Sequence, residues 1–246
     1  NAEAPLRETF ASGLISVAGY RRAKILVDPF CGSGTIPIEA AMYALNIAPG
    51  ANRKFACENF INFKSFDFAR SQAKANQVDC DARIFASDIS PQMTDLTRYH
   101  AKRAGVEDFI KVSTIAASRV SAPAQTGIII TNPPYGIRLG DAKEMVELGK
   151  EIRTLCDNFS GWQKYILSGN KNIEREMGIS AAKKRRVYNG NIECNFLLFE
   201  NNKKHLFDNT VNINTKELEP TLVAVENLLS FDGIVANPTL SALLNT

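Results

Sequence analysis

The segment that most constrains this chain is Thr131-Asn132-Pro133-Pro134-Tyr135-Gly136, which directly follows the apolar run 127–130. Such a run is typical of a strand that is buried on both faces of a parallel sheet. Two prolines cannot continue a central strand, so we expect the strand to end at Thr131 or Asn132. The chain then leaves the carboxyl edge of the sheet, where open α/β folds bind their ligands. The segment therefore indicates a site at that edge.

The chemical groups of this segment suit one task. The Asn132 side chain and the Pro133 carbonyl can accept hydrogen bonds from a planar amino group, while the Tyr135 ring stacks on the ring that carries the amine. The alternative is an ordinary Pro-Pro turn with a surface tyrosine. The position directly after a buried strand favours the functional interpretation.

A second segment, Asp28-Pro29-Phe30-Cys31-Gly32-Ser33-Gly34-Thr35, lies between a predicted strand (24–27) and a predicted helix (36–46). Strand, Gly-x-Gly turn and helix form a nucleotide-binding loop, because glycine lets the backbone approach a ligand at the helix N-terminus. Pro37 replaces the third glycine of the dinucleotide fingerprint, and both its later acidic residue and a Walker lysine are missing. These departures disfavour NAD and ATP and leave S-adenosylmethionine. Cys31 suits packing under the turn better than a nucleophilic role.

An acidic residue ends the next predicted strand. Residues 83–87 have a strand pattern, and Asp88 follows at their carboxyl end. It is well placed to bind the two ribose hydroxyls of a cofactor. The alternative is a solvated aspartate in a turn.

The rest of the chain alternates between helical and strand patterns. Helices are predicted over residues 5–18, 91–104, 141–159 and 173–177, and strands over 109–115, 127–131 and 162–167. The first helix is expected to bury one apolar face: Leu6, Phe10, Leu14 and Val17. Asn189-Gly190, between residues 183–188 and 192–199, predicts a β-hairpin.

Two further stretches each allow two interpretations. Residues 49–81 are irregular but rich in aromatic residues, which favour a small packed core over a base-stacking surface: Phe55, Phe60, Phe63, Phe66 and Phe68. The basic run Lys183-Lys184-Arg185-Arg186 is either a solvated strand edge or an edge that contacts phosphates beside the active site. A net charge of +3 is too small by itself to indicate nucleic acid.

Composition narrows the class of protein. A chain of 246 residues with 45% hydrophobic residues can bury a sizeable core. No apolar run approaches the length of a membrane span, and the N-terminus lacks a signal-peptide pattern. The five cysteines form no Cys-x-x-Cys pair, so neither a zinc site nor a disulfide framework is indicated, and a reducing cytosol is expected. Because the chain begins at Asn1 and soon enters a predicted helix, we expect it to be a fragment or an excised domain.

Four of these segments occur in an order that resembles a known family: 28–35, 87–89, 131–136 and 186–190. They are similar to the catalytic half of bacterial large-subunit ribosomal RNA guanine-N2 methyltransferases of the THUMP-associated kind. Residues 5–9, 47–50 and 52–55 match as well. The likeness covers about residues 1–200.

The resemblance implies an α/β class I methyltransferase fold, which is Rossmann-like, with a seven-stranded, mostly parallel sheet and an antiparallel last strand. It implies a methyltransferase domain at 1–200. Residues 201–246 lie outside the resemblance, and we interpret them as a C-terminal extension made of a linker and an amphipathic helix. It also implies ribosomal RNA as partner and an upstream THUMP RNA-binding module that this sequence does not contain, and the cytoplasmic location expected from the cysteines agrees with such a partner. The family places an acidic residue after the third strand to touch the adenine amino group, but here that position holds Ala116.

Three sets of residues are predicted to form the site, and no metal is expected. S-adenosylmethionine is expected to contact the glycine loop, the turn after the second strand and the first residue after the buried strand 127–131. These residues are Asp28, Phe30, Cys31, Gly32, Ser33, Gly34, Thr35, Asp88, Ile89 and Asn132. Catalysis is assigned to Asn132, Pro133, Pro134 and Tyr135, and RNA contact to Lys183, Lys184, Arg185 and Arg186. No general base is required, because the amine proton can leave after transfer.

Two alternative functions share the chemistry of amine methylation. A tRNA guanine-N2 or DNA adenine-N6 methyltransferase would use the same four-residue motif, although no DNA-recognition insertion is visible. A cytosine-C5 enzyme is disfavoured because Pro134 stands where its cysteine would be. From a different class, the chain could be a non-catalytic RNA-binding domain of the same fold, and Ala116 is the feature that favours this alternative.

Overall fold

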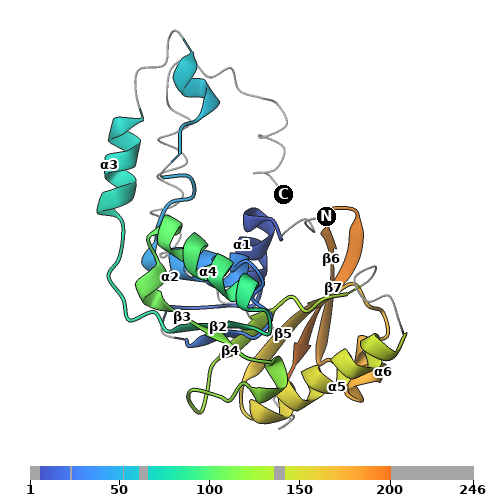
Figure 1. Ribbon diagram of the computed structural model, residues 1–246. Coiled ribbons are helices and arrows are strands. Elements are labelled where there is room, and N and C mark those ends of the chain that lie inside the picture. The colour runs from blue at the N-terminus through green and yellow to red at the C-terminus, as the bar shows by residue number, and fades with distance from the viewer. Residues whose placement is uncertain (1–5, 23, 52, 61–65, 136–141, 201–246) are drawn as a thin grey trace, which may run out of the picture. The chain divides into compact units, whose positions relative to one another are not determined.

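The computed structural model describes residues 6–22, 24–51, 53–60, 66–135 and 142–200 (Figure 1). They form one seven-stranded sheet in the order β3-β2-β1-β4-β5-β7-β6. The strands are β1 Leu26–Asp28, β2 Ile84–Asp88, β3 Ile110–Thr114, β4 Ile128–Thr131, β5 Gln163–Ser168, β6 Lys183–Asn189 and β7 Ile192–Phe199. The first five run parallel, whereas β7 pairs antiparallel with both β5 and β6. This confirms the predicted sheet, and the order of β1 to β5 is that of a doubly wound Rossmann sheet.

Helices cover both faces of this sheet (Figure 1). The helices are α1 Glu8–Val17, α2 Thr35–Leu45, α3 Asp67–Ala75, α4 Pro91–Ala104, α5 Ala142–Asn158 and α6 Ile173–Met177, with short 3-10 turns η1 Ala56–Asn59, η2 Glu107–Phe109 and η3 Ala117–Arg119. Alternate residues of a central strand enter opposite layers. On β4, Ile128 and Ile130 pack into the cluster that includes α1 and α2, whereas Ile129 packs with residues of α5.

The helix α4 shows why some boundaries follow from sequence. Ser90 is its N-cap, with the side-chain oxygen accepting a hydrogen bond from Met93 N at 3.5 Å, and Pro91 occupies the first helical position. Gly105 ends it in the left-handed conformation, with φ of 70°. The predicted range 91–104 is confirmed. Strands β1 to β5 also lie within two residues of their predicted ends.

The buried face of α1 was predicted only in part. Leu6 and Leu14 are buried and Phe10 packs against the core, but Val17 is 44% exposed. Ala11 and Ile15 are buried in its place. Helical rotation explains the error, because positions 11, 14, 15 and 18 share one stripe and position 17 lies beside it.

The aromatic stretch 49–81 differs most from the prediction. It contains η1 and α3, and α3 buries none of its residues. Phe55 and Phe66 do pack together, with ring centroids 5.4 Å apart. However, Phe60 is 67% and Phe68 is 75% exposed. The prediction of a small packed core is therefore wrong for these two rings. Phe63 lies outside the described residues.

The predicted hairpin is confirmed, but its turn lies one residue later than expected. Asn189 pairs with Ile192, so Gly190 and Asn191 form the two-residue loop. Gly190 has φ of 62° at the first loop position, where a type II′ turn requires glycine. Because β7 is antiparallel to β5 and Ser168 pairs with Asn195, the turn extends beyond the carboxyl end of β5.

The predicted extension 201–246, and with it the domain boundary near residue 200, lies outside the described part of the chain.

Among the described residues, no helix is long and apolar enough to cross a membrane.

Two glycines allow a test of how tightly the core packs beside β4. A Cβ on Gly127, directly before β4, would lie 2.3 Å from the Trp162 ring and 2.8 Å from the backbone oxygen of Ile25. We expect Gly127→Ala to lower the free energy of unfolding by roughly 1–3 kcal/mol, because the ring cannot move without disturbing a packed core. Urea denaturation measures the change.

Gly13→Ala is the matched control. Gly13 lies in α1, where a Cβ would meet nothing within 4 Å. Alanine there should raise the free energy of unfolding by roughly 0.5–1 kcal/mol, because glycine is the poorer helix former. Equal effects of the two substitutions would contradict the packing described at Gly127.

Candidate active site

The predicted site residues meet at the carboxyl ends of β1, β2 and β4. β1 and β4 are parallel neighbours, with Leu26 beside Ile128 and Val27 beside Ile129. From β1 the sheet continues through β2 on one side, and from β4 it continues through β5 on the other. This is the switch point of strand order, where open α/β sheets bind ligands.

The Gly-x-Gly loop joins β1 to α2. Gly32 and Gly34 have φ of 52° and 91°, which favour glycine on conformational grounds. At Gly34 a Cβ would also lie 2.9 Å from Thr97 Cγ2. Gly34 is the N-cap of α2 and forms no side-chain cap, so the first N–H groups of α2 receive no capping oxygen from it.

Helix α4 supports this loop through two side chains. This support was not predicted from the sequence. Thr97 Oγ1 donates a hydrogen bond of 2.8 Å to the carbonyl oxygen of Gly32, and His100 Nδ1 lies 2.9 Å from that of Ser33. Thr97 is fully buried. The helical period places these residues three apart on one face of α4, but the sequence does not indicate which loop that face meets.

Asp88 is held beside the loop. Its Oδ2 accepts a hydrogen bond of 3.0 Å from Gly32 N, and its Oδ1 accepts one of 2.9 Å from Ser90 N. Each carboxylate oxygen can accept more than one hydrogen bond, so Asp88 retains acceptor capacity for a ligand. Ile89, the next residue, is 72% exposed.

Asp28 connects the two main motifs. Its Oδ1 accepts hydrogen bonds from Thr131 Oγ1 at 2.7 Å and from Phe30 N at 3.3 Å. Asp28 is 1% exposed, and burial raises the pKa of its carboxyl group to about 7, with the nearby Asp88 charge adding to the effect. Its observed partners are protein groups, so its contact with a cofactor stays a prediction.

Asn132 follows β4 directly. Its side-chain Oδ1 is buried and has no hydrogen-bond partner among the described residues. Pro133 is buried and Pro134 is half-buried. A buried acceptor normally has a donor, so this oxygen is the candidate acceptor for a ligand at this edge.

Tyr135 is held by residues from three other parts of the sheet. Its hydroxyl accepts a hydrogen bond of 3.1 Å from Asn189 Nδ2, and Cys194 Sγ lies 3.6 Å from the same oxygen. Its ring lies against Gly169, the residue after β5. These contacts were not predicted, because they join residues more than 30 positions apart.

The other predicted cofactor residues occupy different environments. Cys31 is buried, with Sγ 3.6 Å from Thr97 Oγ1, and burial raises its thiol pKa strongly, which supports the packing interpretation over a nucleophile. Phe30 packs against the apolar clusters on the α5 side of the sheet. Ser33 lies in the loop, and Thr35 is the first residue of α2.

The basic residues predicted to contact RNA form an exposed edge strand. Lys183, Lys184, Arg185 and Arg186 begin β6, at the edge of the sheet, and all four are exposed. Lys184 Nζ forms an ion pair with a carboxylate oxygen of Glu174. The same strand ends at Asn189, so it runs from this basic edge to the Tyr135 contact.

Ala116, the departure from the family pattern, follows β3 as the N-cap of η3. The neighbouring Ile115 N donates a hydrogen bond of 3.0 Å to the carbonyl oxygen of Asp88, which places this turn beside the Asp88 turn. Among the described residues, no group of three or more His, Cys, Asp or Glu side chains could hold a metal ion.

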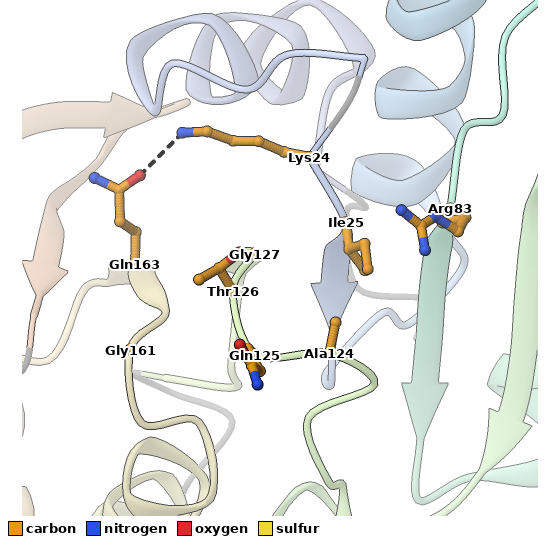
Figure 2. Close-up of a pocket in the computed structure, with 9 residues that line it drawn as sticks. All are labelled: Lys24, Ile25, Arg83, Ala124, Gln125, Thr126, Gly127, Gly161 and Gln163. Carbon is orange, nitrogen blue, oxygen red and sulfur yellow. Dashed lines mark hydrogen bonds between the residues drawn. The ribbon is translucent and has the colours of Figure 1, made fainter.

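A pocket of about 520 Å³ opens at the opposite edge of the sheet (Figure 2). Lys24, Arg83 and the range 124–127 line it, and Lys24 Nζ donates a hydrogen bond of 3.1 Å to Gln163 Oε1. These residues precede or begin their strands, whereas the candidate site follows them. The pocket is therefore separate from the candidate site.

A family model described as the RMKL-like methyltransferase domain matches residues 1–197. The chain belongs to this family. It is 38% identical over 197 residues to the putative RNA methyltransferase YpsC of Bacillus subtilis, covering 78% of this chain and 51% of that protein. It is 36% identical over 206 residues to a ribosomal RNA large subunit methyltransferase K/L of Shewanella loihica, covering 80% of this chain and 29% of that protein.

A solved structure extends the family comparison to three dimensions. A putative methyltransferase complexed with SAH superposes with a TM-score of 0.77 at 33% identity, over 83% of this chain and 55% of that one. The class I methyltransferase fold expected from the resemblance is therefore confirmed. The chain spans about half, or less, of the length of these relatives.

The buried carboxyl group of Asp28 predicts a pH effect on stability. Its pKa is about 7 in the folded chain against an ordinary 3.8, so between about pH 4 and pH 7 the folded chain binds more protons at this group than the unfolded chain. The free energy of unfolding should therefore fall as pH rises across that window, by an amount on the order of a few kcal/mol from this group. Asp28→Asn should remove this fall, because a carboxamide Oδ1 can accept the same two bonds without ionising.

Urea denaturation at several pH values checks this expectation. Asp95→Asn is the control, because Asp95 is an exposed residue whose side chain forms a surface ion pair with Arg98. The control should keep the wild-type pH dependence. An Asp28→Asn chain that also keeps it would show that Asp28 is not the titrating group.

Proposed function

We propose that this chain is the catalytic domain of an RNA methyltransferase that transfers a methyl group from S-adenosylmethionine to an exocyclic base amine, the N2 of a guanine in large-subunit ribosomal RNA. The observation that carries the proposal is the unpartnered Oδ1 of Asn132, a buried acceptor, among the described residues, at the switch point of the sheet. An amino group of a base that has left its helix supplies the missing donor.

The loop around Gly34 fits the cofactor. The N–H groups that begin α2 lack a side-chain cap from Gly34 and lie at the positive end of the helix dipole, which suits the carboxylate of the methionine part. Asp88, fixed by Gly32 N and Ser90 N, retains acceptors for the ribose hydroxyls. Asp28 keeps this loop at a fixed distance from Asn132 through Thr131.

The reaction needs positioning more than acid–base chemistry. S-adenosylmethionine supplies an electrophilic methyl group, and its sulfur–carbon bond breaks, leaving the electron pair on sulfur, as the nitrogen–carbon bond forms. Asn132 Oδ1 and the Pro133 carbonyl accept the amine hydrogens, so the nitrogen lone pair leaves conjugation with the ring and points at the methyl. Tyr135 stacks on the base. The extra proton leaves the nitrogen after transfer, so no strong base is required.

The choice of substrate rests on likeness and charge. A relative that shares 36% identity is named a ribosomal RNA large subunit methyltransferase, and the exposed basic edge of β6 suits a phosphate backbone. Asn132 and Tyr135 cannot by themselves distinguish guanine N2 from adenine N6, because both are planar aromatic amines. The guanine assignment is therefore an argument by analogy.

Removing the acceptor tests the catalytic assignment. Asn132→Ala should lower turnover on the order of a hundredfold or more, comparable to losing one oxyanion-hole donor, while calorimetry shows cofactor affinity largely retained. Asn132→Asp keeps an acceptor oxygen in place and should retain more activity than the alanine variant. Near-normal turnover of a folded Asn132→Ala chain would remove Asn132 from the mechanism.

The identity of the modified base is tested directly. Ribosomal RNA is reacted with the chain and methyl-labelled S-adenosylmethionine, digested to nucleosides and separated. We expect label in N2-methylguanosine. Label in N6-methyladenosine instead would refute the guanine assignment but leave amine methylation intact, and label in 5-methylcytidine would refute both.

A further inference from the structure

Gly169 faces the Tyr135 ring. It follows β5 and is not among the glycines with positive φ, so its backbone conformation is open to other residues. A Cβ at this position would nevertheless lie 2.7 Å from Tyr135 Cδ2 and 2.9 Å from Cε2. These distances are shorter than van der Waals contact allows. The ring, and not the backbone, therefore requires glycine at position 169.

The opposite end of Tyr135 is also held. Its hydroxyl accepts the hydrogen bond from Asn189 Nδ2 at 3.1 Å. Asn189 is the last residue of β6 and pairs across the hairpin with Ile192, whose Cγ2 would lie 3.4 Å from a Cβ on Gly169. Asn189 at the end of the hairpin and Gly169 after β5 thus both contact Tyr135.

We infer that Gly169 and Asn189 are positioning residues that fix the Tyr135 ring for the base to be methylated. The inference rests on the proposed function. A stacked base needs a ring whose plane is already set, because ordering the ring at the moment of binding would cost affinity and misplace the amine. Gly169 sets how close the ring lies to the end of β5, and Asn189 fixes the position of the hydroxyl end of the ring.

The inference links RNA contact to the site. Asn189 lies on the same strand as the exposed residues Lys183 to Arg186. A strand that contacts the RNA backbone at one end and holds the stacking ring at the other relates the position of the phosphates to that of the target base. The substrate class is thus an RNA whose target base leaves its stack beside a backbone segment bound along β6.

The first part of the test measures the steric contact without any reaction. Gly169→Ala should lower the midpoint of thermal unfolding by several degrees in the full chain, because the ring must move. In a Tyr135→Ala background the same substitution should have little effect. Gly13→Ala, in α1, is the control and should shift the midpoint equally in both backgrounds. If Gly169→Ala lowers the midpoint of thermal unfolding equally in both backgrounds, the inference that Gly169 holds the Tyr135 ring is wrong.

The second part measures methyl transfer to ribosomal RNA. Gly169→Ala and Asn189→Ala should each lower kcat by on the order of tenfold or more and leave the calorimetric Kd for S-adenosylmethionine unchanged. In a Tyr135→Phe background, Asn189→Ala should cost nothing further, because the hydroxyl that it orients is absent. A merely structural role would lower kcat equally in both backgrounds.

The outcomes separate this inference from the proposed function. If the wild-type chain transfers methyl groups and both variants turn over normally, the positioning role is wrong and the proposed function stands. The same conclusion follows if Asn189→Ala costs as much in the Tyr135→Phe background as in the wild-type chain. If the wild-type chain with ribosomal RNA and S-adenosylmethionine transfers nothing, the proposed function fails and the positioning role fails with it.

Discussion

The site depends on the buried hydrogen bond between Thr131 Oγ1 and Asp28 Oδ1, 2.7 Å long. Both residues are at most 1% exposed, and each ends a strand at the centre of the sheet. A hydrogen bond in a region of low dielectric is strong, and without this one the buried Thr131 hydroxyl would lose its acceptor while Asp28 Oδ1 would keep only the longer bond from Phe30 N. The bond therefore fixes the start of the glycine loop relative to Asn132. The proposed in-line methyl transfer requires this relation, since the loop proposed to bind the methyl donor and the motif proposed to bind the base follow different strands.

The features that sequence predicted are those whose causes are local. The range of α4 follows from Ser90, Pro91 and Gly105, which act on the backbone within one helical turn. The end of β4 follows from two prolines that cannot join a ladder. The grouping of the glycine loop, Asp88 and Asn132 at one edge also follows, because parallel strands place all their carboxyl ends together.

The features that sequence did not predict depend on contacts between distant residues. Nothing near Asp28 in the sequence indicates that its hydrogen-bond partner Thr131 comes from β4, or that burial raises the pKa of its carboxyl group to about 7. The support of the loop by Thr97 and His100 depends on which face of α4 meets it. In the stretch 49–81, aromatic composition alone suggested a core, but packing requires a second apolar surface, and α3 buries none of its residues. Periodicity cannot supply these relations, because each requires the fold first.

The reversed strand β7 explains how a hairpin takes part in a site built on parallel strands. A parallel strand after β5 would begin at the amino edge and carry its preceding turn away from the site. Because β7 is antiparallel, it begins beyond Ser168 at the carboxyl edge, and the turn before it projects there. Asn189 then reaches the Tyr135 hydroxyl, and Gly169 receives the ring. One change of strand direction thus places the basic residues and the Asn189 contact to Tyr135, the aromatic residue of the proposed catalytic motif, on the same strand.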